Sequence, residues 1–329
     1  MQSISCIILK GIAEHLKLLM DNRKIKHSNS CCPSDIILEY INIRLKWIYP
    51  KPRKVEKSKE LKDRINNKNF IIDDKTVDEN TANEIIELIN HFTKKFEQGD
   101  DLNNHLNRQI FQSENFDTLL NIWNIKHLHL NKKEVNSKTA MKSNRSDWLL
   151  FFIVDNDNVY FIDVLQHPKR EEFIKYNFLK TIFNNDWINL SGFKEISEAI
   201  SENDSLNITD DKKIYEFYKN KINIITFKFN DKIYGKIGNN IACSGDKILS
   251  IYILNEFKKK LNNIFKENYY QESIFKLDKD SLLCTIKTQQ TISQNSTKHK
   301  NITYTIIFNN QNIFILDKNK NKIFEYKFI

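Results

Sequence analysis

The chain has 329 residues, of which 40% are apolar and 12% aromatic, so it has ample material for a buried core and for about two domains. Charged residues make up 28%, and 51 basic residues stand against 42 acidic ones, which excludes a weakly hydrophobic, disordered polymer. The six glycines and four prolines are too few for a collagen-like or linker-dominated chain. No run approaches the ~18 consecutive apolar residues of a membrane-spanning helix, and the N-terminus lacks the pattern of a signal peptide. We therefore expect a cytoplasmic protein without a membrane partner.

The first third of the chain is predicted to be helical. Ser34–Asp35 can cap an apolar stripe that ends before Pro50. A second helix opens at Asn80–Thr81, carries apolar residues at spacings of three and four, and stops at Gly99. Two shorter helices are expected near residues 101–112 and 116–123.

At Asn124 the pattern changes from helical to strand-like. Residues 125–130 alternate with a period of two, and residues 148–154 form the continuous apolar run that is typical of a central strand. The next strand is expected at 159–165 after a turn, and a helix at about 171–183. These elements predict a small antiparallel sheet with helices before and after it.

The last third is predicted to contain a hairpin, a long helix and a meander. The hairpin joins residues 222–229 to 232–237, and the helix spans about 246–269. The polar segment 289–301 is expected to be a loop between two strands. The strands of the meander are expected at residues 273–277, 282–288, 302–308, 313–316 and 323–328.

The predicted fold class is α+β, with N-terminal helices, a central antiparallel sheet flanked by helices, and a C-terminal helix with an antiparallel meander. Residues 1–70 form a basic helical region, and residues 71–190 form the α+β domain that carries the candidate catalytic site. Residues 191–211 are expected to be a linker. Residues 212–329 are expected to form a second α+β domain with a regulatory or interaction role.

Three histidines and an arginine are predicted to meet at one edge of the central sheet. His127 and His129 are two residues apart on a strand, so their side chains share one face. His167 follows the last strand of the hairpin, and Arg145 lies one residue from the position expected opposite His167. Two imidazoles on a core strand would need polar partners if they were buried, which makes the pair unusual.

The register of this hairpin follows from its turn. Pairing of Val154 with Val159 places Leu150 opposite Asp163, and a bulge would shift that pairing by one residue. Asp163 lies among apolar neighbours, so we expect it either to orient a histidine or to lie at an edge.

Basic residues surround the predicted histidine cluster. Some lie in the loop between the histidine strand and the hairpin, and two follow His167, so they can contact a phosphate backbone. These expected RNA-binding residues are Lys132, Lys133, Lys138, Lys142, Lys169 and Arg170.

The combination of three imidazoles and a guanidinium suits metal-free cleavage of RNA. One group removes the proton of the 2′-hydroxyl, and another protonates the 5′-oxygen that leaves, while a fixed cation neutralises charge on the phosphorane. Histidine, with an unperturbed pKa of ~6.5, serves as base or acid near neutrality. No cofactor is expected, because the chain has no Walker loop and no G-x-G-x-x-G motif.

The helices, the H-L-H-L strand, the arginine before L-L-F and the F-I-D-V-L-Q-H strand resemble the RelE/ParE superfamily of toxins, over residues of about 120–170. Its RelE and HigB branches are ribosome-dependent mRNA interferases, in which basic and histidine residues on central antiparallel strands perform or support cleavage. The resemblance implies that His127, His129, Arg145 and His167 form the site.

The resemblance also implies a biological setting. RNA or the ribosome would be the partner, and an antitoxin or a phage protein would be a second one. The chain is much longer than those toxins, so its other parts would be regulatory, such as a built-in inhibitor or a sensor. Larger proteins of this kind occur in bacterial anti-phage abortive-infection systems.

Two alternatives remain open at this point. An H-x-H pair can bind a metal ion, with His167, Asp163 or Glu134 as a further ligand, which would make the protein a metal-dependent nuclease. A non-catalytic module would instead bind nucleic acid or a phage protein through the basic stripe Lys51–Arg64. The simpler interpretation of this stripe is a solvated, lysine-rich helix in a polar, partly mobile segment.

Overall fold

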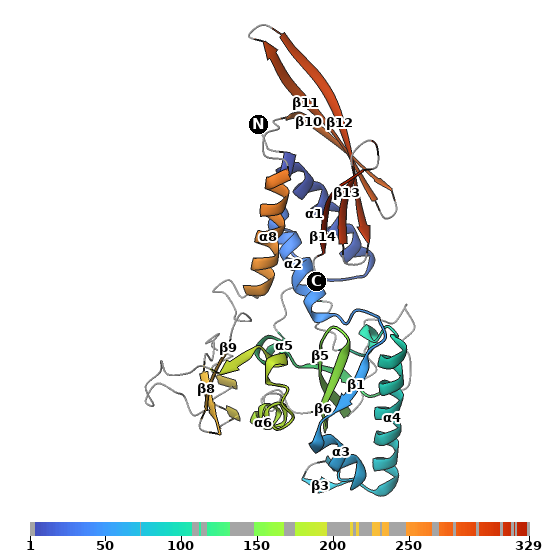
Figure 1. Cartoon of the computed structure of the whole chain (residues 1–329). Coiled ribbons are helices and arrows are strands. Elements are labelled where there is room, and N and C mark those ends of the chain that lie inside the picture. Colours follow the sequence, from blue (N-terminus) through green and yellow to red (C-terminus); the bar gives the residue numbers. More distant parts are fainter. Residues whose placement is uncertain are drawn as a thin grey trace. The chain divides into compact units, whose positions relative to one another are not determined.

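The computed structural model describes residues 4–72, 74–106, 112, 117–131, 148–167, 175–195, 211–212, 215–216, 226–230, 232–236, 248–264, 270–278, 281–293, 296–309, 312–316, 319 and 321–327. The fold is α+β, as the sequence predicts (Figure 1). The chain divides into two compact units. The central unit comprises Lys46–Ile110 and Asn115–Ile248, and the terminal unit comprises Met1–Leu45, Phe111–Glu114 and Leu249–Ile329.

This division differs from the expected domain boundaries. The expected region 1–70 is cut after residue 45, and the expected domain 212–329 is cut after residue 248. Both ends of the chain build one unit, in which the buried Ser250 Oγ donates a hydrogen bond of 2.6 Å to Asn42 Oδ1.

The central unit is built on a four-stranded sheet of order β1-β6-β5-β4. Strand β5 (Trp148–Val154) runs antiparallel to both of its neighbours, β4 (Lys126–His129) and β6 (Asn158–Gln166). Strand β1 (Lys54–Lys57) pairs with β6 in parallel, so the sheet is mixed and not purely antiparallel.

A β-bulge shifts the register of the β5–β6 hairpin. Val154 pairs with Val159 as expected, but farther along β6 the residue Ile162 is inserted without a partner on β5. Asp163 therefore pairs with Phe151, and the expected pairing of Asp163 with Leu150 is wrong by one residue.

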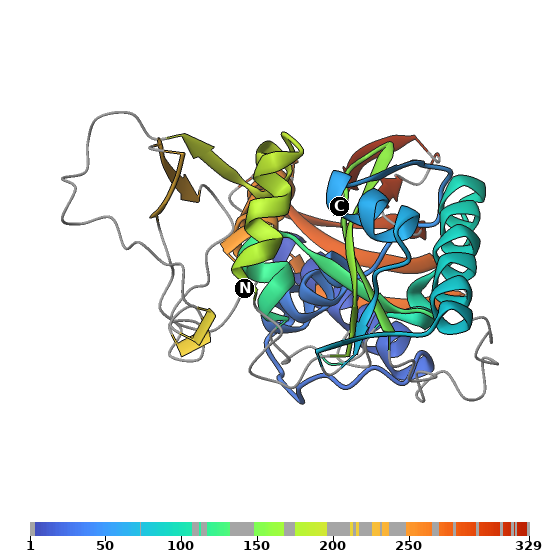
Figure 2. The same ribbon diagram turned by 90° about the horizontal axis from the view of Figure 1, so that it is seen from below.

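Helices cover both faces of this sheet (Figures 1 and 2). On one face, Phe96 of α4 (Glu79–Gln98) packs its ring 5.4 Å from that of Phe152. On the other face, Phe178 of α6 (Tyr176–Asn184) lies 4.6 Å from Phe151. The core on the α6 side comprises Leu119, Trp123, Ile125, Leu149, Phe151, Ile153, Ile162, Phe178, Leu179, Ile182, Phe183, Trp187 and Phe193.

Helix α4 begins and ends with side-chain and backbone caps. The side chain of Asp78 accepts a hydrogen bond from the amide of Thr81, and Gly99 ends the helix in the left-handed conformation with φ +79°. The predicted stop at Gly99 is therefore confirmed, and the helix begins at Glu79, one residue before the expected Asn80–Thr81.

Shorter elements complete the central unit. They are α3 (Lys59–Asn66), β2 (Ile71–Ile72), β3 (Lys75–Thr76), a 3₁₀ turn at Asn103–His105, α5 (Thr118–Trp123), a 3₁₀ turn at Ile188–Ser191, β7 (Phe193–Glu195), β8 (Thr226–Phe229) and β9 (Lys232–Lys236). The predicted hairpin forms between β8 and β9, and β7 adds a third strand to it from within the expected linker. Residues 107–111, 116 and 171–174, which fall in predicted helices, lie outside the described residues.

The terminal unit combines three helices with a five-stranded antiparallel meander. The helices are α1 (Ile4–Asn22), α2 (Pro33–Lys46) and α8 (Ile248–Ile264). The strands, in spatial order, are β10 (Tyr270–Asp278), β11 (Ser281–Ser293), β12 (Ser296–Asn309), β13 (Asn312–Leu316) and β14 (Lys322–Lys327). The expected loop at 289–301 is wrong, because Gln289 pairs with His299 and the ladder continues to Ser293 and Ser296. Within the described residues, no helix is both long and apolar enough to cross a membrane.

Candidate functional site

Strand β4 presents two histidines on one face of the central sheet. His127 pairs with Phe151 and His129 with Leu149, so both rings share the face on which α6 packs. His127 is 7% exposed and His129 is 5% exposed. The strand therefore buries two imidazoles at positions where its neighbour carries apolar side chains.

His167 joins this pair from the far end of β6. It directly follows β6 and is exposed, and its ring centroid lies 5.7 Å from that of His129 with the two planes inclined by 26°. The sheet thus stacks two imidazoles that are far apart in the sequence. His127 also belongs to the cluster, since it interacts electrostatically with His167.

The surroundings of His127 favour its neutral form. Burial lowers the pKa of His127, the carboxylate of Asp117 opposes this, and a positive charge on His167 would lower it further. Asp117 caps α5, and its Oδ1 accepts a hydrogen bond of 3.1 Å from the amide of Leu120. A neutral imidazole at neutral pH can accept a proton, which fits a general base.

Two buried lysines lie near this part of the sheet. Lys46 is 4% exposed, and burial lowers its pKa to about 8, while Asp117 opposes this. Lys126 is also buried, and its Nζ donates a hydrogen bond of 2.8 Å to the carbonyl oxygen of Lys46. Neither residue was predicted from the sequence, because a chain so rich in lysine offers no pattern that marks the buried ones.

The cationic part of the predicted site lies outside the described residues. This applies to Arg145, the expected phosphorane cation, and to the basic residues on either side of the cluster. The latter are Lys132, Lys133, Lys138, Lys142, Lys169 and Arg170. Their roles stay predictions.

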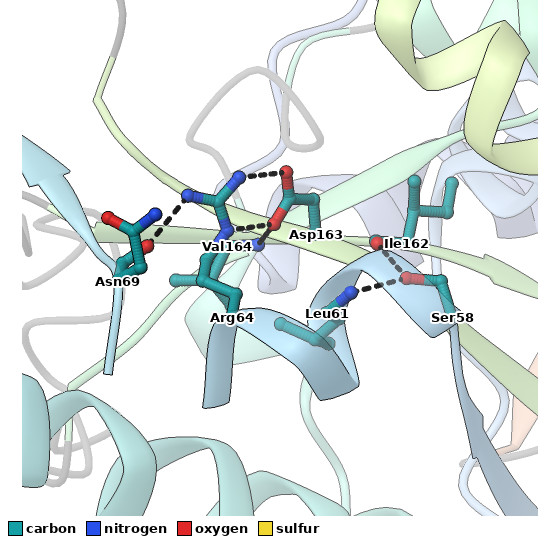
Figure 3. A network of polar contacts seen from close by, with 7 residues as sticks. All are labelled: Ser58, Leu61, Arg64, Asn69, Ile162, Asp163 and Val164. Atoms are coloured by element: carbon teal, nitrogen blue, oxygen red, sulfur yellow. Dashed lines mark hydrogen bonds and ion pairs between the residues drawn. The ribbon is translucent and has the colours of Figure 1, made fainter. Parts of the chain in front are cut away.

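Asp163 forms a bidentate ion pair with α3 (Figure 3). Arg64 Nε donates to Asp163 Oδ1 at 2.9 Å, and a terminal nitrogen donates to Oδ2 at 3.1 Å. The amide of Val164 also donates to Oδ1, at 2.8 Å. Burial raises the pKa of Asp163, whereas Arg64 and the Val164 amide oppose that rise. An orienting role toward a histidine stays a prediction.

Ser58 holds the bulge of β6 against the start of α3 (Figure 3). Its hydroxyl donates a hydrogen bond of 2.7 Å to the carbonyl of Ile162, and the same oxygen accepts one of 2.9 Å from the amide of Leu61. One fully buried side chain therefore caps a helix and satisfies the bulged strand. Neither Ser58 nor the ion pair of Arg64 was predicted from the sequence, although a serine three residues before a buried leucine is a usual helix start.

The basic stripe Lys51–Arg64 forms β1 and α3, and its Lys54, Lys59 and Lys62 are exposed. Four of its cations contact residues outside the stripe, among them Lys59, whose Nζ donates a hydrogen bond of 3.1 Å to the carbonyl of Asn184. Lys51 pairs with Asp157 at 2.9 Å, and Arg64 pairs with Asp163. Arg53 is 7% exposed and donates a hydrogen bond of 2.7 Å to the carbonyl of Tyr49. These contacts leave the stripe with fewer cations for a nucleic acid than its composition indicates.

The described residues contain no group of three or more histidine, cysteine, aspartate or glutamate side chains that could hold a metal ion. The expected metal alternative therefore has no ligand set in that part of the chain. Comparison with protein-family models, with curated proteins and with solved structures found no match to this chain.

Proposed function

We propose that the central unit is a RelE-like ribonuclease that cleaves RNA by acid–base chemistry without a metal ion. The observation that carries this proposal is the stacking of His129 and His167 at 5.7 Å, next to His127. Histidine pairs of this kind provide both a proton acceptor and a proton donor near neutral pH. The likeness to mRNA interferases adds support, since both β4 histidines belong to an antiparallel part of the sheet.

The proposed reaction assigns a role to each ring. Neutral His127 takes the proton of the 2′-hydroxyl, whose oxygen attacks the adjacent phosphorus. The bond from phosphorus to the 5′-oxygen breaks, and exposed His167, which exchanges protons with solvent, protonates that oxygen. The products are a 2′,3′-cyclic phosphate and a 5′-hydroxyl end. His129 positions His167 through their stacked rings, and Arg145 supplies the cation for the phosphorane.

The biological setting is part of the same proposal. A toxin of this type would act on RNA or on ribosomes in the cytoplasm during anti-phage defence, as in abortive infection. The terminal unit would then regulate the central one, in response to an antitoxin or a phage protein.

One observation favours a second function. His127 and His129 are nearly buried, at 7% and 5% exposure, which is also the state of histidines with a purely structural role. Under this alternative the protein is a module that binds nucleic acid or a phage protein without cutting RNA.

The test compares cleavage of RNA by the wild type with cleavage by two variants. His167→Ala is the main variant, because His167 is exposed and its loss spares the core. His129→Gln keeps a polar side chain at the buried position. The matched control is His27→Ala, which removes a histidine that pairs with Asp21 in the terminal unit.

The proposal expects the wild type and His27→Ala to cut RNA, with or without ribosomes, and His167→Ala to lose at least about a hundredfold in rate. Equal rates for His167→Ala and the wild type would overturn the assignment of the site. Intact RNA in every reaction, together with measurable RNA binding, would establish the binding module.

A further inference from the structure

Strands β11 and β12 extend beyond their neighbours in the terminal sheet (Figure 1). Strand β10 pairs with β11 only as far as Thr288, and β13 pairs with β12 only from Thr305 onward. Beyond these points β11 and β12 continue to pair with each other, to Ser293 and Ser296. We call residues 287–293 of β11 and 296–301 of β12 the arm; its base, Lys287 and Thr288, still pairs with β10.

The composition of the two strands changes where the arm begins. The inner parts of β11 and β12 carry the apolar residues Leu282, Leu283, Ile286, Ile302, Tyr304, Ile306, Ile307 and Phe308. The described residues of the arm contain one apolar residue, Ile292, among threonine, serine, glutamine, asparagine, lysine and histidine. A two-stranded ribbon without an apolar face is marginally stable by itself, and the sequence of the arm provides no such face.

The arm is basic and has no acidic residue. Residues 281–309 contain Lys287, Lys298, Lys300 and His299 but no aspartate or glutamate. Lys298 and Lys300 are two residues apart on β12, so both positions lie on one face of the ribbon, opposite Gln290 and Thr288 in register. Lys287 pairs with Asn301 on one side and with Glu272 of β10 on the other, so this third cation position, on the other face, lies at the base of the arm beside an acidic residue.

Lysines on an exposed strand edge also have a simpler use, since they prevent sheets from associating edge to edge. That role needs one or two charges, and it does not require the ladder to continue past both neighbouring strands. The length of the arm and the positive charge of Lys298 and Lys300 complement a polyanion, because each phosphate contact releases a counterion.

We propose that the arm binds RNA through the phosphate backbone and does not read base sequence. The arm contains no aromatic residue, so it has no platform on which bases can stack. The choice of RNA over DNA rests on the ribonuclease function proposed above, whereas phosphate binding itself does not depend on it.

The test measures binding of a fluorescent 2′-O-methyl RNA of thirty nucleotides, which cannot be cleaved through a 2′-hydroxyl. The arm variant is K287Q/K298Q/K300Q. The control variant is K10Q/K259Q/K322Q, which removes three charges from exposed positions of the same unit. If all three arm lysines contact phosphates, the slope of log K against log salt falls by about 2, and affinity falls about a hundredfold at 0.1 M salt. The control retains both the slope and the affinity.

A second variant removes the arm altogether. Asn-Gly replaces residues 288–300 and joins Lys287 to Asn301, which are directly paired, through a two-residue turn. This variant loses Ile292 but keeps the apolar residues of the inner parts of both strands, so its melting temperature should match that of the wild type while its RNA binding falls.

Unchanged binding in both arm variants would overturn the proposal, as would an equal loss in the control. Tighter binding of a DNA duplex of the same sequence would overturn the choice of RNA. Because the probe cannot be cleaved, the two proposals fail independently. The arm variants can leave binding of the probe unchanged while the wild type still cleaves RNA through His167, and the wild type can leave RNA intact while the arm still binds the probe.

Discussion

The ion pair between Arg64 and Asp163 gives the sharpest test of how the central sheet is held together. Substitution of Arg64 by Met removes two hydrogen bonds to the carboxylate, of 2.9 and 3.1 Å, and a third of 3.0 Å to the carbonyl of Asn69. The side chain of Asp163 is only 15% exposed and that of Arg64 is 21% exposed. The variant therefore leaves a carboxylate that is largely desolvated and has no counterion.

Breaking a buried ion pair by removing one partner costs about 3–5 kcal/mol, and the partial exposure of this pair favours the lower end, about 3 kcal/mol. The double variant Arg64→Met, Asp163→Asn should recover part of that loss, because it removes the uncompensated charge. The coupling energy of the double-mutant cycle should be about 2 kcal/mol.

The loss of stability caused by Arg64→Met also depends on pH. Loss of Arg64 removes an interaction that lowers the pKa of Asp163, so the pKa of this carboxyl rises further above its unfolded value. A carboxyl of this kind destabilises the fold at neutral pH, and the destabilisation decreases as pH falls toward 4.

Urea unfolding followed by tryptophan fluorescence measures the free energy of unfolding of the central unit. All four tryptophans, Trp47, Trp123, Trp148 and Trp187, belong to the central unit. A loss below about 1 kcal/mol for Arg64→Met, or a coupling energy near zero, would refute the view that this pair fastens α3 to the sheet.

Two further variants test the packing of the central unit by the same assay. Gly99→Ala should cost about 2–4 kcal/mol, because Gly99 has φ +79° and an added Cβ would lie 2.5 Å from backbone atoms of Lys51 and Pro52; an unchanged free energy of unfolding would contradict this. Lys46→Met should stabilise the fold by up to about 3 kcal/mol at pH 7, because burial lowers the pKa of Lys46 from 10.5 to about 8. Since the unfolded chain binds more protons between those values, wild-type stability rises from pH 8 to 10.5 and the advantage of Lys46→Met disappears there. An advantage that does not change with pH would show that charge burial is not its cause.

Local sequence patterns predicted the elements that depend on near neighbours. The end of α4 follows from Gly99, whose lack of a Cβ permits the left-handed conformation. Strands β5 and β6 follow from two apolar runs joined by a polar turn, and the pairing of Val154 with Val159 is as expected. The two β4 histidines share a face because side chains alternate along a strand.

Features that depend on distant partners could not be predicted in this way. The bulge at Ile162 is stabilised by Ser58, which lies 104 residues earlier in the chain, so no pattern within the hairpin reveals it. The ion pair of Asp163 with Arg64 likewise joins residues that are 99 positions apart. These two contacts explain why the register of Asp163 was wrong by one residue and why its ion pair with α3 was not foreseen.

The arm was missed for a different physical reason. Its ladder consists of backbone hydrogen bonds, and its sequence lacks the alternation of apolar and polar residues by which strands are recognised. A polar ribbon and a polar loop therefore have the same appearance in the sequence. The pairing of Gln289 with His299 in the structure identifies the segment as a ribbon.

The ends of the RNA fragments test the central claim most directly. Purified protein is incubated with RNA in the presence of EDTA, and the new termini are identified by mass spectrometry, with His167→Ala as the control. Cleavage by imidazole acid–base chemistry predicts 2′,3′-cyclic phosphate and 5′-hydroxyl ends that form in EDTA and disappear in the variant. Fragments with 3′-hydroxyl ends, or cleavage that EDTA abolishes, would contradict the account.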